Sequence, residues 1–375
     1  MKYAESITIG NRTSSNKLFK SATYEGAPYL VEDDLNQYVN YYKSVTDCGI
    51  VTVGFSTVDS EERYYGLPQV SWTGDGSDHW KTRIPVALNQ IREANPSTLY
   101  LQQLAHPGYF SGNDKMVPSM IEGVTEDATV LTDEQIDVIL DKFVEAAVAI
   151  EKATFDGVVL HTAHHFLLSM LVSPFFNVRE GKYSVVQMPG VMADLVGRIK
   201  EATGDDFIVM AKINTEDYIK PELGLGLTAG GSTFIVEQMA LAGCDGFVAS
   251  GAGNLACTMG AAKTGKPLPE KQAVFKAVTR MWKTALTRLE SKAVVIGINL
   301  IRTGTVMDEL IENEYCDMIG FGRAIMRERD LCTKLLNDID YTGTCKNCNF
   351  CFQKLGEIGI CDIEGQCALK HFRGV

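Results

Sequence analysis

The amino-acid sequence predicts a closed (β/α)8 barrel, an α/β TIM barrel, and three observations lead to this fold class. Short apolar, β-branched segments recur along the chain, each is followed by a longer stretch with helical periodicity, and eight such segments can be counted. Strands that alternate with helices form a parallel sheet, and eight of them can close into a barrel. An open doubly wound sheet normally has a glycine-rich phosphate turn after its first strand, and none follows the first segment here.

The predicted strands are short apolar runs, as expected for parallel strands that are buried on both faces. In chain order they are Leu18–Ala22, Gly49–Gly54, Leu99–Leu104, Gly157–His161, Phe207–Ile213, Asp245–Ser250, Ala293–Gly297 and Asp317–Gly322.

One predicted helix carries its own start signal. Thr132 and Gln135 have the spacing of a capping box, in which two side chains bind backbone N–H groups at the start of a helix. The apolar residues that follow share one helical face, namely Ile136, Ile139, Leu140, Phe143, Ala147 and Ile150. Further helices are expected near Asp34–Thr46, Val191–Ala202, Thr233–Ala242, Gln272–Leu289 and Val306–Glu312.

Two long connections and a distinct tail complete the predicted organisation. Residues Asp59–Ser77 are rich in glycine, tyrosine and charge, which favours a loop over the barrel mouth, and Pro107–Leu131 forms another long connection after the third strand. The alternation of strands and helices stops after about Asp340. We therefore expect a barrel domain over residues 1–340 and a cysteine-rich tail over residues 341–375.

Charge and hydropathy narrow the classes of partner. The chain has 35 basic and 47 acidic residues, a formal charge of −12, and no basic block, so nucleic acid and anionic membranes are not expected as partners. No apolar run is long enough to span a membrane, and the polar start of the chain does not resemble a secretion signal. These features predict a cytoplasmic protein, and they leave a homo-oligomer open.

The ten cysteines fall into two groups. Five are dispersed along the barrel sequence and five lie between Cys345 and Cys367. In a reducing compartment such a cluster indicates a metal site or has no special role, because stable disulfides are rare there.

Three of the six histidines follow one predicted strand. His161, His164 and His165 lie at the end of the apolar run Gly157–Leu160. A single histidine at such a place is more often a core residue with its hydrogen bonds satisfied. Three together, at the strand end where barrel enzymes hold their ligands, indicate a functional site.

Other polar residues stand at the ends of the remaining strands. Lys212 and Arg323 offer positive charge, and the turn Gly320–Arg323 allows backbone N–H groups to approach an anion. A phosphate after the seventh and eighth strands is the expected placement in this fold. The full set is Ser21, Thr23, Gln103, His106, His161, His164, Lys212, Asn214, Ser250, Asn299, Gly322 and Arg323.

With these residues and motifs the chain resembles the old yellow enzyme family of FMN-dependent ene-reductases, including the barrel domain of 2,4-dienoyl-CoA reductases and trimethylamine dehydrogenases. The resemblance covers roughly residues 5–335 and rests on five segments in the right order, each at a predicted strand end. They are Asn16–Glu25, Gln103–Gly108, His161–Arg179, Lys212–Asn214 and Gly320–Ala324.

The resemblance implies a role for each strand end. Ser21, Ala22 and Thr23 would line the flavin, with Thr23 near its carbonyl and reactive nitrogen, and Gly54 is assigned to the same cofactor site. Gln103 would bind the pyrimidine edge, and Lys212 would stabilise the negative charge of reduced flavin. Asn299, Gly322 and Arg323 would hold the FMN phosphate.

The same resemblance assigns the catalytic residues. His161 and His164 match the pair that binds the carbonyl oxygen of the substrate. Two N–H donors at that oxygen make the β-carbon of an enone a better hydride acceptor. The implied reaction transfers hydride from NAD(P)H through FMN to the C=C bond of an α,β-unsaturated carbonyl compound.

Several positions depart from the family pattern. The usual proton donor is a tyrosine two residues after the second histidine, and Phe166 occupies that place. Water, His165, Tyr24 and Tyr109 are the alternative sources of a proton. His165 also replaces a glycine, and the seventh strand ends in Gly297-Ile298-Asn299 where relatives have a double glycine.

The tail has its own ligand pattern. Cys345, Cys348 and Cys351 have the spacing of three iron–sulfur ligands, and Cys361 or Cys367 would be the fourth. The dienoyl-CoA reductase type of relative carries a four-iron cluster at this place, so the resemblance implies a [4Fe-4S] cluster. Zinc and free thiols are the alternatives.

Two rival functions remain open at this point. A metal-dependent barrel hydrolase would use His161, His164 and His165 as ligands, but it needs carboxylates at other strand ends, and these are scarce. A flavin or iron–sulfur electron-transfer protein that has lost ene-reductase activity would explain both Phe166 and the cysteine-rich tail.

Overall fold

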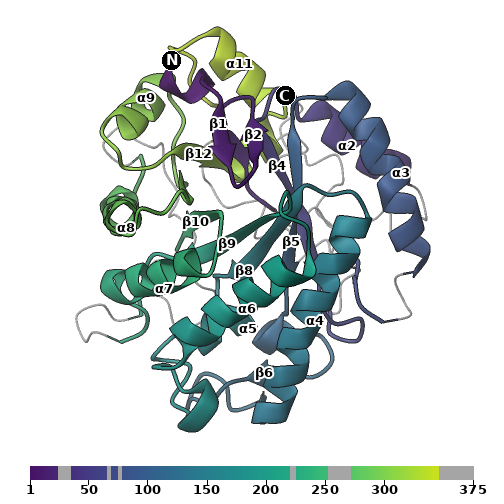
Figure 1. Cartoon of the computed structure of the whole chain (residues 1–375), viewed down its shortest axis with the longest axis vertical. Coiled ribbons are helices and arrows are strands. Elements are labelled where there is room, and N and C mark those ends of the chain that lie inside the picture. The colour runs from purple at the N-terminus through teal and green to yellow at the C-terminus, as the bar shows by residue number, and fades with distance from the viewer. Residues whose placement is uncertain (24–34, 66–68, 75–77, 220–224, 252–271, 346–375) are drawn as a thin grey trace.

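Eight parallel strands form a closed barrel in the computed structural model, which describes residues 1–23, 35–65, 69–74, 78–219, 225–251 and 272–345 (Figure 1). All eight predicted strands are present, which confirms the expected fold class. Around the barrel they are β3 (Leu18–Lys20), β4 (Ile50–Thr57), β5 (Leu99–Ala105), β8 (Gly157–Thr162), β9 (Ile208–Asn214), β10 (Gly246–Ser250), β11 (Val294–Gly297) and β12 (Met318–Phe321), and β12 pairs with β3.

The barrel interior is filled with apolar side chains. Along each strand, successive side chains point to opposite faces, so every second residue faces the barrel axis. Where β8 pairs with β9, Val159 lies beside Met210 and both are buried in the interior cluster. The same cluster takes one or two residues from each strand, including Phe19, Ile50, Leu101, Val248, Ile296 and Met318.

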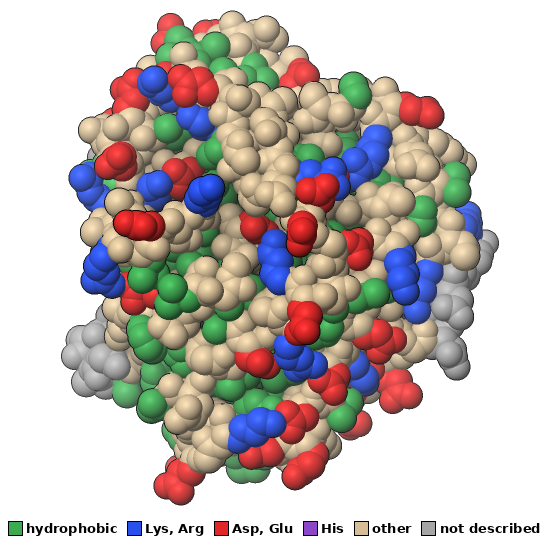
Figure 2. Space-filling model, viewed as in Figure 1, with side chains coloured by type: hydrophobic (Ala, Val, Ile, Leu, Met, Phe, Trp, Pro, Cys, Tyr) green, Lys and Arg blue, Asp and Glu red, His purple; other side chains and the backbone are tan. Residues whose placement is uncertain are grey.

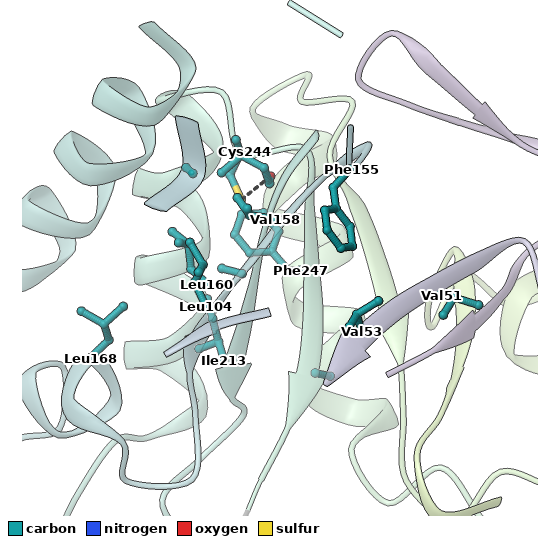
Figure 3. Close-up of a cluster of buried hydrophobic side chains, with 14 of the residues drawn as sticks. Val51, Val53, Leu104, Phe155, Val158, Leu160, Leu168, Ile213, Cys244 and Phe247 are labelled. Atoms are coloured by element: carbon teal, nitrogen blue, oxygen red, sulfur yellow. Dashed lines mark hydrogen bonds between the residues drawn. The ribbon is translucent and has the colours of Figure 1, made fainter. Parts of the chain in front are cut away.

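The alternate residues of the strands face outward and form a second, larger core beneath the helices. Figure 3 shows part of it, with Val51 and Val53 from β4 and Val158 and Leu160 from β8 among the side chains drawn. Burial on both faces explains why these strands read as continuous apolar runs in the sequence.

The predicted helices are present, and the capping box at Thr132 is formed, with Gln135 as its partner. The helices that match the predictions are α2 (Leu35–Ser44), α4 (Asp133–Lys152), α6 (Met188–Ala202), α7 (Ala229–Leu241), α8 (Lys276–Arg288) and α9 (Gly304–Glu312). Four further helices were not predicted: α3 (Asp78–Ala94), α5 (Leu167–Leu171), α10 (Arg323–Arg327) and α11 (Leu331–Asn337). Helix α3 contains Pro85, which weakens the helical signal of its sequence.

A small hairpin of β1 (Ile7–Ile9) and β2 (Arg12–Ser14), also unpredicted, closes the amino end of the barrel. Ile9 is fully buried in the interior cluster, and Arg12 donates to the carbonyl of Asp206, just before β9. Ile9 therefore extends the apolar packing of the barrel interior at the amino ends of the strands.

The two long connections lie at that carboxyl end. Thr57 at the end of β4 bridges to Ser71, and Tyr64 bridges to Ser111, so the loop after β4 contacts the connection after β5. The second connection contains η3 (Gly108–Phe110) and a short parallel pair, β6 (Met116–Val117) and β7 (Thr129–Val130). The remaining short elements are η1 (Lys2–Ala4) and η4 (Gly181–Tyr183).

Within the described residues no helix combines the length and the apolar character that a membrane span requires. On the face shown in Figure 2, acidic and basic side chains are interspersed, and neither sign forms a continuous patch.

Candidate active site

A polar layer lies directly above the apolar filling of the barrel. In a strand, the residue two positions after an inward-facing residue also faces inward. A second set of inward-facing residues therefore follows the interior residues Phe19, Leu101, Val159, Met210 and Val248. This set consists of Ser21, Gln103, His161, Lys212 and Ser250, and all five are buried. The structure thus brings together five residues that the sequence placed at separate strand ends.

His161 and His164 form a pair within this layer. Their ring centroids are 5.1 Å apart and the ring planes are inclined by 59°. The His164 Nε2 atom lies 2.8 Å from the Ser250 hydroxyl oxygen, which fixes the orientation of that ring. The Nδ1 atom of His161 is buried and has no hydrogen-bond partner in the described part of the chain.

Both imidazoles are held in the neutral form. Burial lowers the pKa of His164 to about 3, and the positive charge of Lys212 acts in the same direction. The pKa of His161 is likewise lowered well below its ordinary value, by burial first and then by His164 and Lys212. A neutral imidazole carries one N–H, so each ring can donate one hydrogen bond to a ligand oxygen at neutral pH.

Gln103 presents an unused acceptor on β5, the strand that pairs with β8. Its side chain is buried, and its Oε1 atom has no hydrogen-bond partner among the described residues. Buried polar atoms are normally hydrogen-bonded, so an enclosed acceptor at a barrel mouth indicates a ligand with an N–H or O–H group. The imide N–H of a flavin pyrimidine ring has this chemistry, so Gln103 fits the predicted cofactor.

A buried polar network supports the histidine segment from below. Asn214 accepts a hydrogen bond from the His164 N–H at 3.2 Å and donates to Asp217 at 3.0 Å. Asp217 also accepts from the Ser173 hydroxyl at 2.5 Å. His164 and His165 both adopt φ of +62°, a left-handed conformation that is uncommon outside glycine and that such contacts maintain.

His165 does not join the pair. Its ring packs on Phe176 with centroids 4.6 Å apart, and its Nε2 atom lies 3.9 Å from Asp217. The three histidines therefore do not converge on one point. Consistent with this, the described residues contain no group of three or more His, Cys, Asp or Glu residues that could hold a metal, so the structure gives the hydrolase hypothesis no support.

An aromatic cluster, formed by Phe55, Tyr64, Phe110 and Phe166, covers His161. Phe166 meets the His161 ring edge-on at 4.6 Å, and Tyr64 stacks on Phe166 at 5.4 Å with the planes inclined by only 16°. Sequence reasoning missed Tyr64 because it belongs to the loop after β4, far from the histidines in the chain. Of the tyrosines named as alternative proton donors, Tyr109 donates to the exposed Asp127, and Tyr24 lies outside the described residues.

Closure of the barrel places the first and eighth strands side by side. The Ser21 N–H donates to the Phe321 carbonyl at 2.8 Å, and a Cβ added at Gly322 would lie 3.7 Å from the Thr23 side chain. The rim therefore joins the two segments assigned to flavin and phosphate, although about 300 residues separate them. The remaining members of these groups are Ala22, Asn299 and Arg323, all partly exposed at the rim.

Two predicted cofactor residues have backbone features of their own. The N–H of Gly54 donates to the Tyr42 hydroxyl at 3.0 Å, so this donor is already engaged within the protein. Asn299 has φ of +93°, and its carbonyl accepts from the Ala273 N–H at 3.0 Å. The cofactor role of both residues remains a prediction.

The predicted metal site lies mostly outside the described residues. Of its four cysteines, Cys345 is described and buried, whereas Cys348, Cys351 and Cys361 fall in the range 346–375. Beside Cys345 lies Arg302, a buried arginine that the sequence analysis did not single out. It belongs to the connection after β11, and no local sequence signal marks it.

A closed parallel barrel with a polar layer at the carboxyl ends of its strands defines a barrel enzyme with its site at one mouth. The model of the NADH:flavin oxidoreductase / NADH oxidase family matches residues 5–341. The chain belongs to this family, and the resemblance inferred from the sequence is confirmed.

Individual relatives agree with this assignment. The chain is 32% identical over 118 residues to an NADH oxidase of Thermoanaerobacter brockii, a match that spans 30% of this chain and 18% of the relative. It is 24% identical over 331 residues to an NADPH dehydrogenase of Bacillus velezensis, which covers 86% of this chain and 89% of the relative.

The solved structures include the old yellow enzyme of Trypanosoma cruzi. Its TM-score is 0.73 at 16% identity, and the match covers 92% of this chain and 95% of that one. This likeness shows the barrel fold.

Proposed function

We propose that the protein transfers hydride from NAD(P)H, through FMN, to the C=C bond of an α,β-unsaturated carbonyl compound. The observation that carries this proposal is the buried pair of neutral imidazoles, His161 and His164, within the polar layer at the barrel mouth. Two N–H donors that converge on one oxygen stabilise the negative charge that develops when an enone accepts hydride.

Different residues of the polar layer serve the substrate and the cofactor. Gln103 has an acceptor suited to the flavin pyrimidine ring, and Lys212 adds a buried positive charge to the same layer. FMN supplies hydride-transfer chemistry when it is bound. Asn214 acts on the pair indirectly, since it holds the His164 backbone while Ser250 orients the ring.

The source of the proton is the least conventional part of this site. Phe166 cannot donate a proton, and its ring is enclosed by Phe55, Tyr64 and Phe110. Water that enters with the substrate is a sufficient donor for the α-carbon of an enolate. We therefore infer that protonation of the substrate α-carbon is a slow step, and that the substrate can be reduced despite this slow step.

A [4Fe-4S] cluster on Cys345, Cys348, Cys351 and Cys361 remains a proposal, as does assembly into a homo-oligomer. Burial of Cys345 at the base of the tail is compatible with a cluster held near the barrel. Iron and acid-labile sulfide, assayed in anaerobically purified protein, distinguish a cluster from zinc and from free thiols.

The function is tested by spectroscopy and rapid mixing. We expect the protein to show flavin absorbance after reconstitution with FMN, to be bleached by NADH or NADPH without oxygen, and to be reoxidised by 2-cyclohexenone. Protein that stays colourless after reconstitution contradicts the proposal.

A second candidate function is electron transfer without ene reduction, which the phenylalanine at position 166 favours. In that case reduced protein would transfer electrons to a protein or metal-complex acceptor and would not react with any enone. Stopped-flow reoxidation by 2-cyclohexenone and by ferricyanide separates the two candidates.

A further inference from the structure

Asp217 is a fully buried carboxylate that lies just after the end of β9. It accepts hydrogen bonds from three separate segments: the Asn214 amide donates at 3.0 Å, the Ser173 hydroxyl at 2.5 Å and the Leu227 N–H at 2.8 Å. A carboxylate is removed from water at a high cost unless such donors satisfy its oxygens. Asp217 therefore joins the segment after α5, the end of β9 and the start of α7.

The carboxylate fixes which way the Asn214 amide faces. A carboxylate can only accept hydrogen bonds, so the amino group of Asn214 must face Asp217. The amide carbonyl of Asn214 then faces the His164 backbone and accepts its N–H at 3.2 Å. If the amide were rotated by half a turn, its amino group would face the His164 N–H and neither could accept. Asp217 thus determines that Asn214 is an acceptor for His164.

The backbone at His164 needs this acceptor because its conformation is unusual. His164 and His165 both have φ of +62°, a region that residues with a Cβ adopt only when their surroundings hold them there. The His165 N–H donates to the Ser169 hydroxyl at 3.2 Å, and Asn214 donates to the same hydroxyl at 3.4 Å. Loss of these contacts would let the backbone relax and would turn the His164 ring away from Ser250.

We propose that Asp217 is a positioning residue, which acts through Asn214 to hold the His164 imidazole in the direction that donates to the substrate oxygen. The expected effect on rate rests on the proposed function, whereas the positioning is a property of the protein alone. Because the hydrogen bonds run from Asp217 through Asn214 to the His164 backbone, a change at Asp217 should reach the donor pair and leave flavin affinity unchanged.

The test exchanges the two side chains. Asp217→Asn puts an amide where Asn214 needs an acceptor, and Asn214→Asp puts two carboxylates against each other. The double variant, Asn214→Asp with Asp217→Asn, again has one donor facing one acceptor, and its residue 214 still accepts the His164 N–H. Asp141→Asn, which changes an exposed carboxylate of α4, is the control.

Rapid mixing measures flavin reoxidation by 2-cyclohexenone and by ferricyanide in each variant. Each single variant is expected to slow the enone reaction about 10- to 100-fold, because the donor ring is misplaced. The ferricyanide reaction and the dissociation constant of FMN should not change. The double variant should recover to within about fivefold of the wild type, because the two effects are coupled. Asp141→Asn should match the wild type.

Amide hydrogen exchange gives a second readout that needs neither flavin nor substrate. The peptide that contains His164 and His165 is expected to exchange about tenfold faster or more in each single variant, and to return towards the wild-type rate in the double variant. Peptides from α4 should exchange at the wild-type rate in all variants. This contrast separates local positioning from a general loss of stability.

Several outcomes overturn the inference. An unchanged enone rate in Asp217→Asn removes the positioning role, and equal losses with both acceptors, without recovery in the double variant, make Asp217 a purely structural residue. Should Asp217→Asn fail to fold, a double variant that is no faster than Asn214→Asp contradicts the proposal. If no enone reoxidises the wild type, the proposed function fails, and exchange at His164 in the same variants then decides the positioning role separately.

Discussion

His161 and Lys212 are lateral partners in the neighbouring strands β8 and β9, and both side chains are buried inside the barrel. Burial is the main cause of the lowered pKa of His161, and the positive charges of a protonated His164 and of Lys212 would lower it further. The charge of Lys212 acts on any anionic ligand that enters this layer, so under the proposed function the pair would link the substrate donors to the flavin.

Replacement of Lys212 is expected to change the flavin reduction potential. Lys212→Met removes the positive charge that would stabilise anionic reduced flavin, so the potential should fall by on the order of 30 mV or more, about 1.4 kcal/mol for a two-electron couple. Lys212→Arg keeps the charge and should stay near the wild type. Dye-equilibration titration measures both, and equal potentials in Lys212→Met and wild type would contradict the assignment.

Replacement of either paired histidine is expected to slow the acceptor step. His161→Leu and His164→Leu should each reduce the rate of flavin reoxidation by 2-cyclohexenone about 10²- to 10³-fold, because each removes one N–H donor to the developing oxyanion. Reoxidation by ferricyanide, which needs no such donor, serves as the internal control. A similar loss with both acceptors would indicate general damage to the barrel mouth.

Introduction of a tyrosine at position 166 is expected to accelerate enone reduction. Phe166 meets His161 edge-on at 4.6 Å, so a hydroxyl on this ring would lie close to the donor pair. General acid catalysis contributes about 10²- to 10⁴-fold in favourable geometry, and a gain of about tenfold or more is expected for Phe166→Tyr. Phe110→Tyr, in the same aromatic cluster, is the matched control, and an equal gain there would contradict a positional effect.

Protein stability is expected to fall as the pH decreases from about 6.5. Burial lowers the pKa of His106 to about 4 and that of His164 to about 3, so the unfolded chain binds protons that the folded protein does not. The neutral rings make their full contribution to stability above pH 6.5, the ordinary pKa of histidine. This contribution is lost progressively as the pH falls towards the lowered pKa values of the folded protein.

Each such histidine contributes a slope of up to about 1.4 kcal/mol per pH unit within that window. The free energy of unfolding in urea, measured between pH 7.5 and 4.5, checks the slope. His106 lies outside the His161–His164 pair, and His106→Asn removes its titrating ring. The stability of this variant should therefore depend less steeply on pH, by the slope that one histidine contributes. A free energy of unfolding that does not change between pH 7 and 5 would rule the account out.

The strands and most helices could be predicted because their signals are local. Apolar runs such as Gly157–Leu160 and the capping box at Thr132 depend only on neighbouring residues. The sequence did not predict α3, because its internal proline conflicts with its other helical signals. It also did not predict the β1–β2 hairpin, because that element depends on partners that are distant in the chain.

The residues of the polar layer could be predicted to the extent that strand ends mark them. His161, Lys212 and Gln103 follow apolar runs, and the two-residue period of a strand then dictates that they face the axis. Arg302 and Tyr64 belong to connections without periodicity. Which residues they contact is decided by packing between segments that are far apart in the chain.

The sequence by itself therefore determined the barrel class and the strand-end residues, because periodicity and turn chemistry are short-range properties of the chain. Only the tertiary structure decided which groups meet: it separated His165 from the His161–His164 pair, placed Tyr64 over Phe166, and left the Arg302 guanidinium buried without a described counter-ion. The physical reason is that burial, pKa shifts and ring contacts arise from packing between residues that are distant in the chain, and no local pattern encodes those distances.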